Sequence, residues 1–407
     1  MIKDALEIIK TAIAAADPFD RTAEIIKELS LSVSGRLAVM SIGKAAVPMA
    51  MAAEGTLGSK INCGLVVTKY EHASGFSSKR FEVIEAAHPV SDENSILAAE
   101  KGLEIARSLK EGDVLLVLLS GGGSALFEKS AVTPEKQRTI TQKLLSRGAS
   151  IDEMNAVRRR ISLVKGGRLA AAAYPAEVVT VALSDVLGND KSVIASGITV
   201  PESLSFEQVK AVVQKYLPEE ENELLPIISE NADVKINDRG YFFAGNVELL
   251  CAAAEKKAKE LGYAVREKSC SLCGEARDAA ERLIKNALKA KGKNAYIYGG
   301  ETTVTLKGSG LGGRNQEMAL CAAVLLKEKD GIVFASAGSD GTDGPTDAAG
   351  GFADGSTFER IKNGGADPIA ALENNDSYHA LKSGGSLIVT GPTGTNVNDL
   401  TVILTDF

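Results

Sequence analysis

The stretch Gly299-Gly-Glu-Thr-Thr-Val-Thr-Leu-Lys-Gly-Ser-Gly-Leu-Gly-Gly-Arg-Asn-Gln-Glu-Met-Ala-Leu320 joins three local signals. The β-branched residues between Thr302 and Leu306 predict a strand, Gly308 to Gly313 predict a loop, and Arg314 opens a predicted helix. Free N–H groups, the helix dipole and a guanidinium would then point at one place. We interpret this stretch as half of a phosphoryl-transfer site.

Length and patterning predict an α/β protein of two domains. The chain has 407 residues, 44% of them apolar, which exceeds the size at which one core keeps growing. Apolar runs alternate with helical patterns, as in parallel β-α units. The charged segment from Pro201 to Arg239 interrupts this alternation, so we expect domains over residues 1–236 and 237–407.

Charge and cysteine content exclude several classes. The net charge of −7 argues against a nucleic-acid or anionic-membrane partner. No apolar run reaches the length of a membrane span, and the chain starts with an amphipathic pattern rather than a signal peptide, which predicts a cytoplasmic protein. Five cysteines do not make a disulfide framework, and zinc at the single Cys270-Ser-Leu-Cys273 would need two further ligands close by in space, in a chain with only three histidines.

Polar and glycine-rich tips follow several predicted strands. They begin at Gly43, Ser120, Ser184, Gly308 and Gly338. Ligands of open α/β sheets lie beyond the carboxyl ends of the strands, so these tips can converge only if the two domains face each other. The pattern therefore predicts a site in an interdomain cleft.

The loop Ser120-Gly121-Gly122-Gly123-Ser124 would let backbone N–H groups approach a phosphate without interference from Cβ atoms. A tight structural turn explains the glycine triplet about as well. No GxxxxGK[ST] sequence occurs, and no GxGxxG follows the first strand, which weakens the ordinary P-loop and dinucleotide interpretations.

Lys44 stands where a strand passes directly into a helix. An ammonium there faces the positive end of the helix dipole unless an anion, either a carboxylate or a phosphate, neutralises both. A surface lysine is the plainer alternative, and the dipole argument favours function. For Arg158-Arg159-Arg160 the default expectation is a solvated helix face.

Several aspartates lie in loops after strands and could bind a metal. Mg²⁺ usually takes one or two carboxylates and shares its other positions with phosphate and water. Turn formation explains any single aspartate equally well, so only their gathering favours a metal. The candidates are Asp185, Asp190, Asp340, Asp343 and Asp347.

Read together, these stretches resemble the glycerate 2-kinase family, the class related to hydroxypyruvate-reductase-operon kinases, over nearly the whole chain. Several independent blocks occur in one order, which makes the resemblance specific. The blocks are Gly43-Lys-Ala45, His88-Pro-Val-Ser-Asp92, Ser120-Gly-Gly-Gly-Ser-Ala-Leu126, Asn155-Ala-Val-Arg158, Lys165-Gly-Gly-Arg168, Ser184-Asp-Val186, Ala195-Ser-Gly197, Gly300-Glu-Thr-Thr-Val304, Gly312-Gly-Arg-Asn-Gln-Glu317, Asp343-Gly-Pro-Thr-Asp347 and Gly391-Pro-Thr-Gly-Thr-Asn-Val-Asn-Asp399.

The resemblance implies ATP-dependent phosphorylation of D-glycerate with Mg²⁺. It also implies a larger Rossmann-like α/β/α domain and a smaller α/β domain with a mixed sheet. Lys44 and Arg314 would be the principal catalytic cations, and Asp185 would accept the hydroxyl proton. The remaining roles would be ATP binding by Ser120, Gly121, Gly122, Gly123 and Ser124, substrate binding by Lys44, Arg158 and Glu301, and metal binding by Asp340 and Asp343.

Two other functions remain open on the residues alone. One is a non-catalytic regulator that binds a sugar phosphate or nucleotide, and the other is an NAD-linked hydroxyacid oxidoreductase. Clustered aspartates disfavour the first because a mere anion binder has no use for them without a metal. The missing dinucleotide fingerprint disfavours the second. The residues do not decide between the 2- and the 3-hydroxyl, which only the resemblance assigns to position 2, and they leave the oligomeric state open, a homodimer included.

Overall fold

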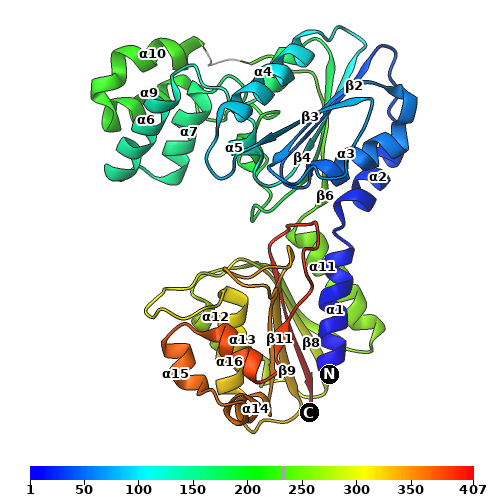
Figure 1. The fold of residues 1–407 in the computed structure, drawn as a ribbon, viewed down its shortest axis with the longest axis vertical. Coiled ribbons are helices and arrows are strands. Elements are labelled where there is room, and N and C mark those ends of the chain that lie inside the picture. Colours follow the sequence, from blue (N-terminus) through cyan, green and yellow to red (C-terminus); the bar gives the residue numbers. More distant parts are fainter. Residues whose placement is uncertain (231–233) are drawn as a thin grey trace. The chain divides into compact units, whose positions relative to one another are not determined.

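The structure is a computed structural model that describes residues 1–230 and 234–407. The chain divides into two compact units, each with its own sheet (Figure 1). We call Pro18–Leu183 with Asn189–Ala244 the parallel-sheet unit. We call Met1–Asp17, Ser184–Gly188 and Gly245–Phe407 together the mixed-sheet unit.

The parallel-sheet unit contains a six-stranded sheet in the order β3-β2-β1-β4-β5-β6. All its pairs run parallel, as the bonds from Val178 to Asn237 and from Ser184 to Gly245 show for β5 and β6. This is the strand order of a Rossmann fold, and its direction reverses between β1 and β4. The strands are β1 (Leu37–Ile42), β2 (Ile61–Lys69), β3 (Phe81–Ala86), β4 (Val114–Leu119), β5 (Glu177–Leu183) and β6 (Asp238–Gly245).

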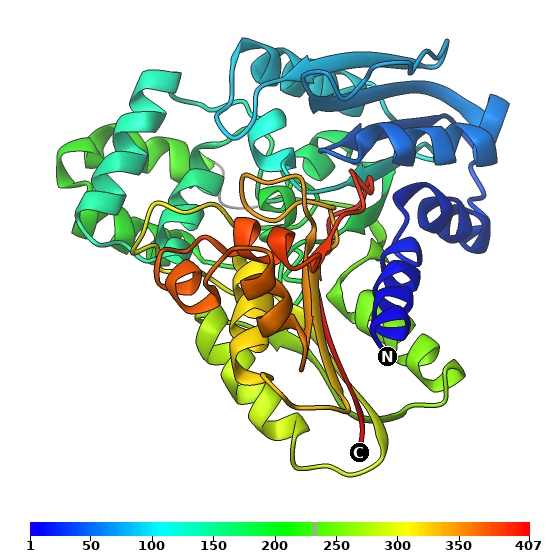
Figure 2. The same cartoon turned by 60° about the horizontal axis from the view of Figure 1, so that its bottom comes forward.

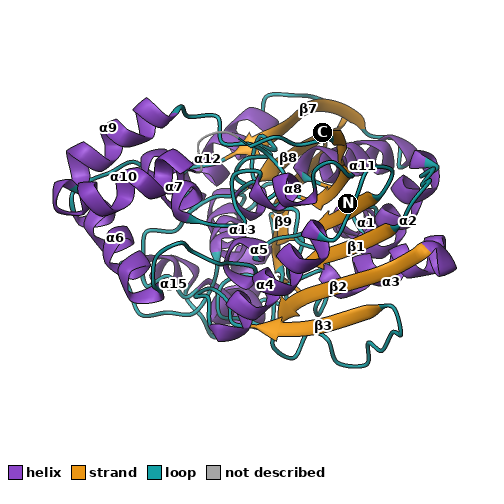
Figure 3. Cartoon of the chain, turned by 90° about the horizontal axis from the view of Figure 1, so that it is seen from above, coloured by secondary structure: helices purple, strands orange, loops and turns teal. Residues whose placement is uncertain are grey.

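Helices cover both faces of this sheet, which gives the predicted three layers. The strands β1 and β4 are buried at every position, as expected for a parallel sheet. One face is covered by α2 (Pro18–Leu29) and α3 (Ala46–Leu57). The other is covered by α4 (Glu93–Arg107), α5 (Gly123–Leu126) and α8 (Arg168–Ala173). Figure 3 shows β1, β2 and β3 as neighbouring strands with α3 alongside.

Four further helices of this unit form a separate cluster away from the sheet (Figures 1 and 3). Their apolar faces make a small core of their own. Capping boxes fix the starts of two of them, with Ser150 and Glu153 at one and Ser205 and Gln208 at the other. The four are α6 (Pro134–Ser146), α7 (Ile151–Ile161), α9 (Phe206–Tyr216) and α10 (Glu221–Glu230).

The mixed-sheet unit has a six-stranded sheet in the order β11-β10-β9-β12-β8-β7. Only β7 and β8 run parallel, and the other pairs are antiparallel, so the predicted mixed sheet is confirmed. The strands are β7 (Ala264–Leu272), β8 (Lys293–Gly300), β9 (Ile332–Gly338), β10 (Gly350–Asp354), β11 (Leu387–Ile388) and β12 (Asp399–Asp406).

Helices also cover both faces of the mixed sheet (Figure 2). One face is covered by α1 (Ile2–Ala14) and α11 (Val247–Glu260). The other carries α12 (Ala276–Ala287), α13 (Arg314–Leu325), α14 (Thr357–Asn363), α15 (Pro368–Glu373) and α16 (Ser377–Ser383). Residues 315 to 323 of α13 are buried on every side, so α13 is a core helix.

The units differ from the expected domains 1–236 and 237–407. Helix α1 lies in the mixed-sheet unit, where Tyr263 donates to Asp4 (2.6 Å) and Lys257 pairs with Glu7 (2.5 Å). Strand β6 extends the parallel sheet because its backbone bonds to β5. The chain therefore passes between the units several times rather than once.

The prediction of a strand between Thr302 and Leu306 is wrong. That stretch is a loop, and only Thr303 makes an isolated bridge, to Glu275. The strand before it, β8, ends at Gly300, where its pairing with β7 and β12 also ends. Beyond that point no strand of the described residues lies alongside the β-branched residues, so they cannot extend the sheet.

The described helices are of ordinary length; α4, for example, has 15 residues with charged groups along one side. Among them, no helix combines the length and the apolar character that a membrane crossing requires.

Candidate active site

In the parallel-sheet unit, the strand order reverses between β1 and β4, and the loops after these two strands lie against each other. Lys44 N–H donates to the carbonyl of Gly121 (2.9 Å), and Ala45 N–H donates to Ser120 Oγ (3.0 Å). The crevice at such a reversal is where open α/β sheets bind ligands. Lys44 and the Ser120–Ser124 loop therefore belong to one site.

Two glycines make this close approach possible. Gly43 has a φ of +129°, and a Cβ there would lie 2.2 Å from Ser120 Oγ. Gly122 has a φ of +88°, and a Cβ there would lie 3.1 Å from the ring of His88. Side chains at either position would strain the backbone and push the loops apart.

The Ser120–Ser124 loop has open backbone donors. Within the described residues, no atom accepts a hydrogen bond from the N–H of Gly121 or Gly122. The helix that follows, α5, spans only Gly123–Leu126, so its dipole contributes less than a long helix would. The individual N–H groups, rather than the dipole, suit this loop to a phosphate.

Lys44 is exposed, and in the described part of the chain no carboxylate pairs with it. It lies two residues before the start of α3 at Ala46, rather than at the helix start itself. Burial, together with the positive charge of Lys44, lowers the pKa of His88 below its ordinary value. Lys44 thus carries an uncompensated charge beside the glycine loop.

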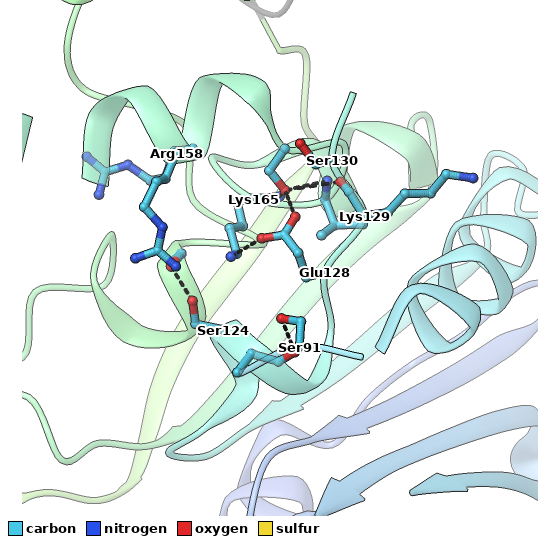
Figure 4. A network of polar contacts seen from close by, with 12 residues as sticks. Ser91, Ser124, Glu128, Lys129, Ser130, Arg158 and Lys165 are labelled. Atoms are coloured by element: carbon cyan, nitrogen blue, oxygen red, sulfur yellow. Dashed lines mark hydrogen bonds and ion pairs between the residues drawn. The ribbon is translucent and has the colours of Figure 1, made fainter. Parts of the chain in front are cut away.

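Ser124 contacts a strained segment. Its Oγ lies 2.7 Å from Ser196 Oγ. Figure 4 labels Ser124 in this network of polar contacts. Ala195 and Ser196 both have positive φ angles, +48° and +55°, which are uncommon for residues other than glycine. Such strain is held where the surroundings fix it, and it gathers at functional sites.

Arg158 lies in the last turn of α7, half-buried, with its Nη1 3.4 Å from Asn155 Oδ1. Beside it, Lys165 forms a buried ion pair with Glu128, whose other oxygen accepts from Ser162 Oγ (2.8 Å) (Figure 4). Burial lowers the pKa of Lys165, and the charge of Arg158 adds to that shift. Among the described residues, no carboxylate pairs with Arg158, so its guanidinium is suited to the carboxylate or phosphate of a ligand.

The expectation of a solvated face for Arg158-Arg159-Arg160 is wrong for two of the three. Arg159 and Arg160 are only 7% and 2% exposed. Arg159 pairs with buried Glu202, and Arg160 Nη2 donates to the carbonyl of Leu204 (2.6 Å). A run of arginines in one helical turn points in several directions, and here two of them point inward.

In the mixed-sheet unit, Arg314 is the first residue of α13 and is held by two carboxylates. Its Nε and Nη2 donate to Asp399 at 2.5 and 3.0 Å, and its Nη1 lies 2.8 Å from Glu301 Oε1. Burial alone would lower the pKa of this guanidinium, but the hydrogen bonds and charge of Asp399 raise it instead. Arg314 is thus permanently charged and fixed in direction.

Asp343 caps the helix that Arg314 begins. The N-cap residue Gly313 has no side chain, and Asp343 accepts from the backbone N–H groups of Asn315 (3.1 Å) and Gln316 (2.8 Å). A Cβ on Gly313 would lie 2.3 Å from this carboxyl group. Burial, to which the charge of Asp399 adds, raises the pKa of Asp343 to about 6. The predicted metal ligand therefore serves the helix start.

The glycine-rich loop before α13 offers fewer free N–H groups than its sequence suggests, because those of residues 307 to 311 are bonded and only those of Gly312 and Gly313 have no acceptor among the described residues. Asn375 Oδ1 accepts from Lys307 and Gly308, at 2.8 and 3.1 Å. The next donors bond to Asn374 and Asp376. Of the anion-binding features expected of this stretch, the guanidinium of Arg314, the start of α13 and the N–H groups of Gly312 and Gly313 remain.

Asp340 and Asp185 lie on loops near the same end of the mixed sheet. Asp340 Oδ1 accepts from the N–H of Thr342 (3.0 Å), and the Asp340 carbonyl accepts from Thr393. The Asp185 carbonyl accepts from Asn398 Nδ2 (2.8 Å), next to the residue that binds Arg314. Across residues 1–230 and 234–407, no group of three or more His, Cys, Asp or Glu side chains is arranged to hold a metal ion. Of the two predicted metal ligands, Asp340 keeps one carboxylate oxygen that accepts from no donor among the described residues, whereas both oxygens of Asp343 accept backbone N–H groups.

The predicted residues thus fall into two sets. The parallel-sheet unit holds Lys44, Arg158 and the Ser120–Ser124 loop, while the mixed-sheet unit holds the other set: Asp185, Glu301, Arg314, Asp340 and Asp343. Sequence reasoning missed Asp399, Lys165, Glu128 and Ser196 as parts of these surroundings. Asp399, Lys165 and Ser196 lie inside the motifs shared with the glycerate 2-kinase family, and this membership is the one feature of the sequence that could have identified them. Their contacts could not be predicted, because their partners are far away in the chain.

The chain is similar to known proteins over nearly its whole length. Residues 4–225 match a family model described as a domain of unknown function, DUF4147, and residues 294–399 match the MOFRL family. A D-glycerate 2-kinase of Thermotoga maritima is 46% identical, covering 98% of this chain and 97% of that one. A glycerate 2-kinase of Pyrococcus horikoshii is 37% identical, covering 98% and 96%.

A solved structure shares the fold. The crystal structure of a glycerate kinase from Thermotoga maritima superposes with a TM-score of 0.94 and 46% sequence identity, covering 99% of each chain. The similarity therefore includes the sheets of both units.

Proposed function

The chain belongs to the glycerate 2-kinase family, and from this premise we propose that it transfers the γ-phosphoryl group of ATP to the 2-hydroxyl of D-glycerate. The single observation that carries the proposal is the 46% identity to a D-glycerate 2-kinase over almost the full length of both chains. The expected loops and cations are present in each unit, which supports the same function.

The open N–H groups of Gly121 and Gly122 suit the loop from Ser120 to Ser124 to nucleotide phosphates. Lys44 beside this loop would neutralise phosphate or glycerate charge, and Arg158 would help to hold the glycerate carboxylate. These groups bind and orient, which supplies much of the acceleration in phosphoryl transfer.

Arg314 would face the charge that develops on the transferred group. Its carboxylate partners fix it before substrate arrives, so it needs no reorganisation during the reaction. Glu301, about half-exposed, can exchange its contact with Arg314 for one with substrate. Asp185 would accept the proton that leaves the glycerate hydroxyl.

Mg²⁺, when bound, neutralises phosphate oxygens. Asp340 is the residue proposed to hold it, because Asp343 caps a helix with both oxygens. The geometry gives the oxidoreductase alternative no support, since the loop after β1 is Gly43-Lys44-Ala45 and lacks a dinucleotide fingerprint.

The test is to incubate the protein with ATP, Mg²⁺ and D-glycerate, follow ADP formation, and identify the product by phosphorus NMR. We expect ADP formation that depends on glycerate and a 2-phosphoglycerate signal. A 3-phosphoglycerate signal would correct the position of transfer. Absence of glycerate-dependent ADP would overturn the proposed function, and parallel assays with NADH and hydroxypyruvate would then test the oxidoreductase.

A further inference from the structure

The two carboxylates that hold Arg314 differ in exposure. The side chain of Asp399 is 7% exposed, whereas that of Glu301 is 48% exposed. Asp399 also binds the guanidinium through two nitrogens, Nε and Nη2, and Glu301 meets only Nη1. One partner is therefore buried and bidentate, and the other is accessible to solvent.

Asp399 occupies a rigid position. It is the first residue of β12, which lies between β8 and β9 in the sheet, and it pairs there with Gly300 and Gly338. A Cβ on Gly338 would lie 2.7 Å from the carbonyl oxygen of Thr342, so the glycine allows the following loop to fold back beside Asp399. The preceding residue, Asn398, accepts from Ser339 N–H and donates to the Asp185 carbonyl.

A carboxylate that binds the Nε side of a guanidinium leaves its opposite edge available. A guanidinium has five N–H donors in one plane, so a bidentate partner fixes that plane. An arginine without such a partner keeps about 2 kcal/mol of rotamer entropy and samples many directions. Asp399 thereby selects one direction for Arg314 and leaves the Nη edge for an anion.

We infer that Asp399 is the positioning residue for Arg314, and that Glu301 is an exchangeable counter-ion which an arriving phosphoryl or carboxylate group replaces. This inference rests on the proposed function. Asp399 touches no substrate; it acts by holding the guanidinium on the strand end. A purely structural Asp399, needed only to seat β12, would instead affect folding and not the action of Arg314.

The first experiment is a double-mutant cycle with Asp399→Asn and Arg314→Ala, assayed for kcat and for both KM values. Asn keeps the shape but loses the second acceptor oxygen and the charge. We expect Asp399→Asn to lower kcat about 100-fold, the effect of a misplaced catalytic group, with KM values changed far less. In the Arg314→Ala background the same change should have almost no further effect on kcat. Asp406→Asn, at the exposed end of the same strand, is the matched control and should leave kcat unchanged.

A second experiment begins with variants that keep Asp399 and change only its partner. Arg314→Lys keeps the charge but cannot bind a carboxylate bidentately, so its kcat should stay close to that of Arg314→Ala. Added guanidinium ion at millimolar concentration should partly restore kcat to Arg314→Ala, where Asp399 can bind it. It should restore nothing to the double variant Arg314→Ala with Asp399→Asn.

Three results would overturn the inference while the wild type remains an active glycerate kinase. They are a near-normal kcat for Asp399→Asn, an equal loss in the wild-type and Arg314→Ala backgrounds, and a near-normal kcat for Arg314→Lys. A wild type without glycerate-dependent ADP formation would instead refute the proposed function, so the two failures are distinguishable.

Discussion

Two glycine-rich loops of similar composition differ in what their backbones do. In the Ser120–Ser124 loop, no described atom accepts from the N–H groups of Gly121 and Gly122. In the loop that leads to α13, Asn374, Asn375 and Asp376 accept from the N–H groups of residues 307 to 311. Glycine content alone therefore does not identify an anion site; side chains from elsewhere decide whether the donors are open.

The cations beside these loops differ in the same sense. Lys44 is exposed and carries no ion pair with a described carboxylate, whereas Arg314 is held by Asp399 and Glu301. An unpaired exposed lysine binds an anion by charge and adapts to it. The carboxylates beside a paired arginine offset part of its positive potential, but they give the side chain a fixed direction. Under the proposed function, the backbone and lysine of one unit would bind the anion, and the arginine of the other unit would stabilise the transition state.

The largest expected effect is that of Arg314→Ala. Because the arginine would act mainly on the transition state, kcat should fall about 1,000-fold, or ~4 kcal/mol, with a smaller change in KM for glycerate. Steady-state kinetics with both substrates measures this. Arg282→Ala, at an exposed position of α12 in the same unit, is the control and should behave as wild type.

Near-normal turnover by Arg314→Ala would contradict the difference in role between Lys44 and Arg314, because the fixed direction of the arginine would then contribute nothing to catalysis. A thermal unfolding curve should accompany the kinetics, since removal of the arginine leaves the carboxylate of Asp399 buried without its partner.

Lys44→Met should have the next largest effect. Methionine keeps most of the stem and removes the charge, so anion binding weakens and kcat/KM should fall about 100-fold, or ~3 kcal/mol. If Lys44 mainly binds, the loss appears largely in KM, in contrast to Arg314→Ala. Isothermal titration with ATP and with glycerate separates the two ligands. A loss confined to kcat would instead mean that Lys44 acts on the transition state rather than in binding.

The sequence predicted the layers of the fold well and the grouping of its elements less well. Apolar runs such as β1 and β4 are buried throughout, which their composition predicts for parallel strands. The N-terminal helix gave no sign that it would join the other unit, because its partners Tyr263 and Lys257 lie about 250 residues away. Amphipathic patterning predicts that one face of a helix is buried, but it does not indicate which element covers that face.

The site could be predicted only where a local argument existed. Lys44 and Arg314 stand near helix starts, and the dipole argument needs nothing beyond neighbouring residues. The role of Asp343 as a cap depends on a contact across 28 positions, and turn-rich sequence around it was compatible with a metal ligand too. Long-range hydrogen bonds of this kind leave no periodic trace in the sequence.

Asn375→Ala tests the loop that leads to α13, in which the N–H groups of residues 307 to 311 are already bonded. Asn375 is 3% exposed, accepts from Lys307 and Gly308, and donates to Glu317. Its loss leaves buried polar groups without partners and should destabilise the protein by ~2 kcal/mol. Urea unfolding measures this, and Asn363→Ala, at the end of α14, serves as control. If the loop donors were instead a ligand site, the variant would bind ATP more tightly at little cost in stability.

The smallest expected effect concerns Asp343, the buried cap of α13. Its pKa of about 6 in the folded protein lies above the value of 3.8 for an ordinary aspartate, so the folded state holds the proton more tightly. The stability contributed by that proton is complete below pH 4 and is lost as the pH rises through 6. Between pH 5 and pH 7 wild type should lose ~1 kcal/mol from this group, a loss that Asp343→Asn should not show. Urea unfolding of both proteins at the two pH values, without divalent metal, measures the difference. A difference that stays constant or changes in the opposite direction would mean that the N–H groups of Asn315 and Gln316 hold the carboxylate ionised, and that burial does not dominate there.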